Sequence, residues 1–106
     1  MGFFDIFIPK DINGEVENAK ANEKSVILDV RTAGEYKGGH IPNSINIPVD
    51  EIGNVAKKYS DKTTPLYIYC LSGARSAGAT RILKDMGYET VVDMGGIGRY
   101  KGQLER

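Results

Sequence analysis

Two short, largely apolar runs constrain the fold of this chain more than any other feature of its sequence. They are SVILDV (25–30) and LYIYC (66–70). Each run is shorter than a typical helix and contains β-branched or aromatic residues, which favour extended structure. Strands that are apolar at almost every position are typical of parallel sheets covered on both faces. We therefore expect both runs to be buried strands, with 66–70 at the centre of the sheet.

Three longer segments around these runs show the spacing of amphipathic helices. The first extends from Asp11 to about Asn22, the second begins at a candidate N-cap, Asp50, and the third covers about a dozen residues from Gly73 or Ala74. The residues expected on one face of the second helix are Ile52, Val55, Ala56 and Tyr59. Those expected on the buried face of the third are Ala79, Ile82, Leu83 and Met86, with Gly87 as the stop signal.

Shorter elements complete the pattern. They are a brief helix at 32–36, a strand in SINIP (44–48), a strand at 88–92, a turn in DMGGIG (93–98) and a closing helix through Leu104. Strands that alternate with helices predict an α/β fold with a mostly parallel central sheet flanked by helices. With 106 residues, the chain is expected to form one compact domain over 1–106.

The N-terminus and the charge balance bear on partners and location. Phe3, Phe4 and Phe7 make 1–8 a candidate hydrophobic strand or flap, or else a contact for a partner. MGFFDIFIPK lacks the features of a signal peptide, and one cysteine forms no internal disulfide, so we expect a cytoplasmic protein. Lys and Arg number 14, as do Asp and Glu, which argues against nucleic acid or a membrane as partner.

The cysteine, Cys70, lies where the strand at 66–70 ends and a helix is about to begin. Ligands bind at this edge of parallel sheets, where backbone N–H groups of loops and helix N-termini converge. The loop of Leu71, Ser72, Gly73 and Ala74 has room to curl into such an anion cradle, and Arg75 adds a cation. These groups lower the pKa of a cysteine. The pattern predicts a nucleophilic thiolate, against the alternative that Cys70 is only a packing residue.

Three segments resemble the rhodanese domain, a sulfurtransferase family: 28–48, 67–88 and 91–102. CLSGARS (70–76) fits the family's C-x-x-G-x-R-S loop, and LDVR…E…GHIP…NIP is the more specific fingerprint. The resemblance implies that Cys70 takes up a sulfane sulfur as a persulfide, in a cradle formed by the N–H groups of Leu71 to Arg75. Arg75 would orient the oxyanion of a donor such as thiosulfate. A thiol or cyanide would then accept the sulfur, with no metal or organic cofactor.

The resemblance implies supporting roles for further residues of the fingerprint. Asp29, Arg31, Glu35 and His40 would form a scaffold, with an Arg31–Glu35 ion pair and with His40 hydrogen-bonded near the loop. An acid–base role for His40 and a place for Arg31 at the mouth of the site stay open. Tyr100 stands where many members of the family carry tryptophan.

Two other functions remain as alternatives. The first is a persulfide carrier, which would pass sulfur to a protein of a sulfur relay with little turnover of small molecules. The second is a cysteine phosphatase or arsenate reductase. Phosphatases of this kind use C-x5-R, whereas Cys70 and Arg75 give C-x4-R, a tighter loop that suits a sulfur atom better than a phosphate.

Overall fold

A computed structural model describes residues 10–106, and the strand or flap expected at 1–8 lies outside this range. Its elements are α2 (Ile12–Ala21), β1 (Val26–Asp29), α3 (Ala33–Lys37), β2 (Ile45–Asn46), the 3₁₀ helix η1 (Val49–Asn54), α4 (Val55–Lys58), β3 (Leu66–Cys70), α5 (Ala74–Asp85), β4 (Val91–Gly96) and the 3₁₀ helix η2 (Ile97–Arg99). Within 10–106, none of the helices combines the length and the apolar character needed to cross a membrane.

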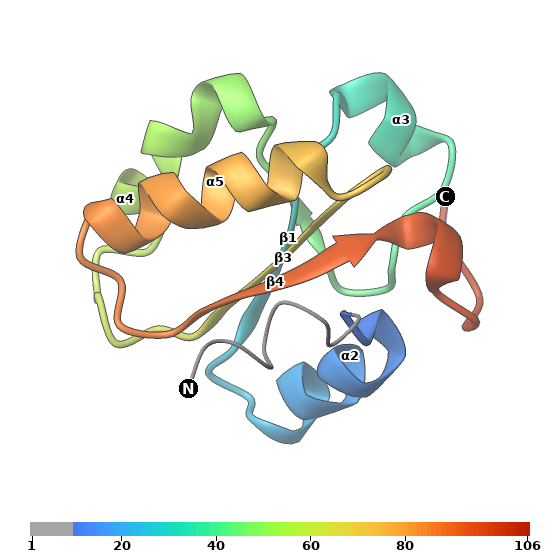
Figure 1. Cartoon of the computed structure of the whole chain (residues 1–106), viewed down its shortest axis with the longest axis horizontal. Helices are drawn as coiled ribbons and strands as arrows, with labels where there is room; N and C mark the ends of the chain where they lie inside the picture. The colour runs from blue at the N-terminus through green and yellow to red at the C-terminus, as the bar shows by residue number, and fades with distance from the viewer. Residues whose placement is uncertain (1–9) are drawn as a thin grey trace, which may run out of the picture.

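The four strands form one parallel sheet in the order β2-β1-β3-β4. The expected compact α/β fold with a parallel sheet is confirmed, and β3 lies inside the sheet between β1 and β4. Helices cover both faces: α4 and α5 lie above the strands in Figure 1, and α2 lies below them.

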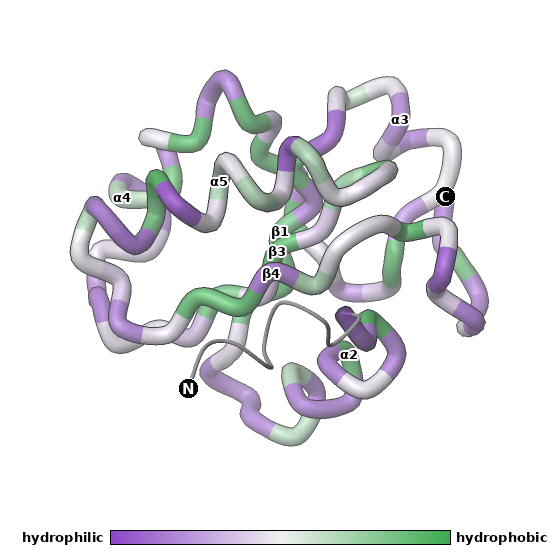
Figure 2. The backbone as a smooth tube through the Cα atoms, viewed as in Figure 1, coloured by the Kyte–Doolittle hydropathy of each residue, from purple (hydrophilic) through white to green (hydrophobic). Residues whose placement is uncertain are grey.

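Alternation along β3 divides the core into two clusters. Leu66, Ile68 and Cys70 belong to the cluster beneath α5, whereas Tyr69 belongs to the cluster that packs on α2. Figure 2 shows the apolar residues concentrated along the central strands, with polar residues on the outer turns of the helices. Because side chains alternate between faces, the position of Cys70 at the end of β3 directs its sulfur toward the beginning of α5.

The last strand differs from the sequence prediction. It covers Val91–Gly96 and not 88–92, so the segment expected to form a turn at 93–98 supplies the end of the strand and η2. Tyr88 instead follows Gly87, which has a φ of +103°. The hydroxyl of Tyr88 donates a hydrogen bond to the carbonyl oxygen of Tyr59 at 2.6 Å. Opposite β3 the strand bulges: Ile68 pairs with Asp93, but Tyr69 pairs with Gly95. The glycines that suggested a turn permit this bulge.

Three details of the helices also differ. The segment after Pro48 begins as η1, and Asp50 lies inside it and does not cap it. The helix expected to close the chain through Leu104 is only the short η2. On α5, Ile82 is 43% exposed, and the buried residues are Ser76, Ala79, Thr80 and Leu83. The buried face of α5 therefore begins with a serine directly after the loop, which a search for apolar residues alone overlooks.

Candidate active site

Cys70 is fully buried, and its sulfur accepts hydrogen bonds from the loop that follows it. The backbone N–H groups of Gly73 and Ser76 lie 3.0 and 3.3 Å from Sγ. Gly73 has a φ of +106°, a conformation that residues with a Cβ rarely adopt. This glycine allows the chain to turn back over the sulfur at the start of α5, so that backbone dipoles point at one atom.

The surroundings of the sulfur shift the pKa of Cys70 in opposite directions. Burial raises this pKa, because a buried thiolate loses its hydration. The hydrogen bonds from the Ser76 side chain and from the N–H groups of Ser76, Gly73 and Ser72 lower it. The net effect places the pKa of Cys70 below that of an ordinary thiol. Of the cradle expected from Leu71 to Arg75, Ser72 and Gly73 contribute, and Ser76 extends it by one residue.

The end of β4 supports the loop from one side. A Cβ placed on Gly96 would lie 2.6 Å from the carbonyl oxygen of Leu71 and 3.1 Å from the Cα of Ser72. Glycine at this position lets the strand and the loop approach backbone to backbone. The side chain of Leu71 points outward and is 52% exposed beside the site.

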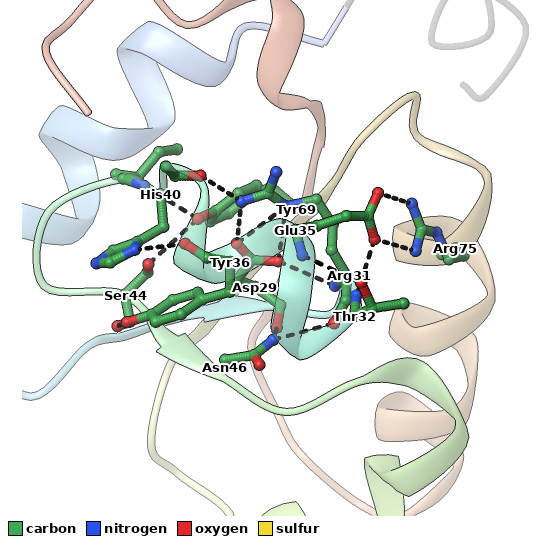
Figure 3. Close-up of polar contacts among 12 residues, drawn as sticks. Asp29, Arg31, Thr32, Glu35, Tyr36, His40, Ser44, Asn46, Tyr69 and Arg75 are labelled. Atoms are coloured by element: carbon green, nitrogen blue, oxygen red, sulfur yellow. Dashed lines mark hydrogen bonds and ion pairs between the residues drawn. The ribbon is translucent and has the colours of Figure 1, made fainter. Parts of the chain in front are cut away.

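Arg75 is engaged by a carboxylate. Its guanidinium donates to both oxygens of Glu35, at 2.8 and 3.0 Å, across the gap between α5 and α3 (Figure 3). The hydrogen bond from Arg75 is the main cause that lowers the pKa of Glu35 to about 2. Glu35 also accepts from the N–H of Thr32 in a capping box. The expected Arg31–Glu35 ion pair is therefore wrong: Glu35 pairs with Arg75.

Arg31 instead forms a buried pair with Asp29, the last residue of β1. Its Nη2 lies 2.7 Å from Asp29 Oδ2 and 2.7 Å from the carbonyl oxygen of Gly39 (Figure 3). Both side chains are almost fully buried. Since a buried charge is tolerated only when it is paired, each residue explains the presence of the other. The pair connects the end of β1 to the loop after α3.

His40 is held by contacts of its own. Its Nδ1 lies 2.9 Å from the carbonyl oxygen of Tyr36, and its ring stacks on that of Tyr36 at 3.7 Å between centroids. Its backbone pairs with Glu105 near the C-terminus. Among residues 10–106, no hydrogen bond joins His40 to Cys70 or to the loop.

For two polar residues at the site, Ser76 and Asp93, the sequence analysis predicted no role. Ser76 closes the C-x-x-G-x-R-S motif, and its hydroxyl lies 3.6 Å from Cys70 Sγ and 2.8 Å from Asp93 Oδ1. Asp93 reaches this hydroxyl from β4. The motif contained a signal for Ser76, but Asp93 falls in the segment that was expected to be a turn. No group of three His, Cys, Asp or Glu side chains within 10–106 is arranged to hold a metal ion.

The sequence model of the family described as Rhodanese-like domain matches residues 13–103. The chain belongs to this family. Among its rhodanese-like relatives, the thiosulfate sulfurtransferase PspE of Escherichia coli is 37% identical over 71 residues, which are 66% of this chain and 68% of PspE. The adenylyltransferase and sulfurtransferase uba4 of Ogataea parapolymorpha is 34% identical over 99 residues, 92% of this chain but 25% of that protein.

A solved structure shows the same rhodanese-like architecture. It is described as a rhodanese with anions from E. coli, and it superimposes with a TM-score of 0.72 at 31% identity. The match covers 77% of this chain and 98% of the other. The chain therefore spans almost a whole small rhodanese, about two thirds of PspE and a quarter of uba4.

Proposed function

We propose that this rhodanese-like protein transfers sulfane sulfur through a persulfide on Cys70. The observation that carries the proposal is the convergence of the Gly73 and Ser76 N–H groups on Sγ. These donors stabilise the thiolate before the reaction, and after it they face a sulfur that has gained a second sulfur atom. The match to a solved structure described as a rhodanese with anions supports the idea of an anion cradle.

The reaction consists of two displacements. The thiolate of Cys70 attacks the outer sulfur of a donor such as thiosulfate; the S–S bond of the donor breaks, and sulfite leaves with the electron pair. An acceptor thiolate or cyanide then attacks the outer sulfur of the persulfide and releases the Cys70 thiolate. In both steps a sulfane sulfur atom is passed on at the same oxidation level, so no further oxidant or reductant is required.

A persulfide carrier is the second candidate, and two observations favour it. Both terminal nitrogens of Arg75 each donate one hydrogen bond to Glu35, whose negative charge weakens the attraction of Arg75 for a small anionic donor. Leu71 exposes an apolar side chain beside Cys70, where a protein partner would contact it. A carrier would load readily from a protein persulfide and discharge quickly only to its partner.

Intact mass measurement tests the proposal. The reduced protein is incubated with thiosulfate, or with polysulfide as a stronger donor, and cyanide is then added. We expect a gain of one sulfur atom that cyanide removes as thiocyanate, and no gain for Cys70→Ser. Steady-state turnover with thiosulfate and cyanide then separates the enzyme from the carrier. Absence of any sulfur gain with both donors would contradict the proposal.

A further inference from the structure

The hydroxyl of Ser76 is fully buried and has three acceptors around its single proton. Asp93 Oδ1 lies 2.8 Å from Ser76 Oγ, the carbonyl oxygen of Gly73 lies 3.0 Å away, and Cys70 Sγ lies 3.6 Å away. A hydroxyl donates one proton and otherwise only accepts. Ser76 therefore cannot donate to all three at once, and the charges of its neighbours decide where its proton points.

The carboxylate of Asp93 is held firmly against this hydroxyl. Its Oδ1 also accepts from the N–H of Gly95 at 3.0 Å, and its side chain is only 14% exposed. The bulge at Met94 and the positive φ of Gly95, +88°, shape β4 at this point. Bulges commonly redirect side chains next to functional sites. The bulge in β4 thus places the Asp93 carboxylate so that the Ser76 hydroxyl lies between it and the Cys70 sulfur.

We propose that Asp93 is a positioning residue that acts through the Ser76 hydroxyl to set the pH at which Cys70 becomes a nucleophile. The proposal rests on the proposed function of Cys70. While Cys70 is a thiol, Ser76 donates to the charged Asp93, because a charge-assisted hydrogen bond is stronger than one to neutral sulfur. The thiol in turn donates its S–H to Ser76 Oγ.

Formation of the thiolate reverses this arrangement. When a solvent base removes the thiol proton, the Ser76 hydroxyl turns from Asp93 to the negative sulfur. Asp93 keeps the hydrogen bond that it accepts from the Gly95 N–H. Asp93 and the thiolate therefore compete for one proton donor, and this competition raises the pKa of Cys70 relative to a site without the carboxylate. Once Sγ carries a second sulfur and is no longer charged, the hydroxyl returns to Asp93.

Other charges act on the same atoms, but through space. Lys10 Nζ lies 3.8 Å from Asp93 Oδ2, and Lys10 and Arg99 line a pocket of about 370 Å³ that also contacts Gly73. On the side of α3, the Arg75–Glu35 pair faces the site. Effects through space do not need the Ser76 hydroxyl. Removal of the hydroxyl therefore distinguishes the proposed competition from simple charge repulsion.

A double-mutant cycle on the full chain tests the proposal. The ultraviolet absorbance of the thiolate is titrated against pH for the native protein, Asp93→Asn, Ser76→Ala and the double variant. We expect Asp93→Asn to lower the midpoint by about one pH unit, because a neutral amide competes less for the Ser76 proton. Ser76→Ala should raise the midpoint, since the thiolate loses a donor. In the Ser76→Ala background, Asp93→Asn should shift the midpoint by less than half as much.

Two outcomes would overturn the proposal: no shift for Asp93→Asn, or an equal shift in both backgrounds. Asp85→Asn is the matched control, since this aspartate is exposed at the end of α5. The midpoint of the Cys70 titration in this variant should equal that of the native protein. If circular dichroism shows that Asp93→Asn is unfolded, Lys10→Gln replaces it in the same cycle, because Lys10 is an exposed partner of Asp93. Part of the effect of Lys10 runs through its partner Asp93, so Lys10→Gln should raise the midpoint more with Ser76 present than in the Ser76→Ala background.

The titration separates this proposal from the proposed function. It uses no sulfur donor and reports only on ionisation of the thiol. If the protein fails to load sulfur, the coupling of Asp93 to Cys70 is still measured. If sulfur loads normally but the cycle shows no coupling, the proposed function stands and the role of Asp93 is withdrawn.

Discussion

At the scale of single residues, the charge of Glu35 should affect how strongly the loop of residues 70–76, the active loop, attracts an anionic donor. Glu35 accepts one hydrogen bond from each terminal nitrogen of the Arg75 guanidinium, although Arg75 is the cation that follows Cys70 in the sequence. Glu35→Gln removes the charge and can still accept from the Thr32 N–H, because glutamine also serves in a capping box. This substitution therefore frees Arg75 while it preserves the start of α3.

We expect Glu35→Gln to lower the KM for thiosulfate by about two- to fivefold, the size expected for a partly exposed charged pair, with kcat unchanged. Steady-state kinetics with cyanide as acceptor measures both constants. Glu51→Gln, which removes an exposed charge in η1, is the control. A rise in KM would contradict this expectation, because it would mean that Glu35 orients Arg75 toward the donor and does not weaken its attraction for the donor.

At the scale of elements, the end of β4 and the active loop depend on each other. Gly96 allows the two backbones to approach so closely that a Cβ would overlap the carbonyl oxygen of Leu71. The atoms in the way belong to the backbone, so they cannot move aside as the end of a side chain would. Gly96→Ala must push the loop away from the strand and disturb the N–H groups that face Cys70.

We expect Gly96→Ala to lower the free energy of unfolding by about 1–3 kcal/mol, the usual cost of overpacking. It should also slow the loading of sulfur on Cys70. Urea unfolding and intact mass measure the two effects. Gly98→Ala is the matched control, since among the described residues nothing lies within 4 Å of a Cβ at that position. Native behaviour of Gly96→Ala would show that the loop shifts without cost.

At the scale of the whole molecule, the Arg75–Glu35 contact joins two helices whose residues lie 40 positions apart in the chain. The pKa of Glu35 falls from its usual 4.5 to about 2 in the folded protein. A carboxylate with a depressed pKa stabilises the fold fully above its unfolded pKa, and this contribution disappears as the pH falls toward the folded pKa. The link between α3 and α5 should therefore weaken between about pH 4.5 and pH 2.

Urea unfolding of the native protein and Glu35→Gln across this range checks the expectation. The native protein should be more stable than the variant near neutral pH, and the difference should shrink steadily below about pH 4.5. A difference that stays constant down to about pH 2 would contradict the assignment, because it would not depend on the charge of Glu35.

The sequence by itself determined the kind of fold and the place of Cys70 in it. Apolar runs such as 66–70 predict buried parallel strands because strands covered on both faces need apolar residues throughout. A cysteine between such a strand and a helix start must then lie at the edge of the sheet where N–H groups converge. Local patterns suffice for these conclusions, since they depend only on neighbours in the chain.

Only the tertiary structure decided how the charged and polar side chains pair. The family resemblance implied a pair of Arg31 with Glu35, but Asp29 binds Arg31, and Glu35 reaches Arg75 from another helix. Asp93 joined the site because a bulge extends β4 through a segment whose glycines indicate a turn. Pairing depends on which elements become neighbours when the sheet assembles, and several partners satisfy the same charge equally well in the sequence.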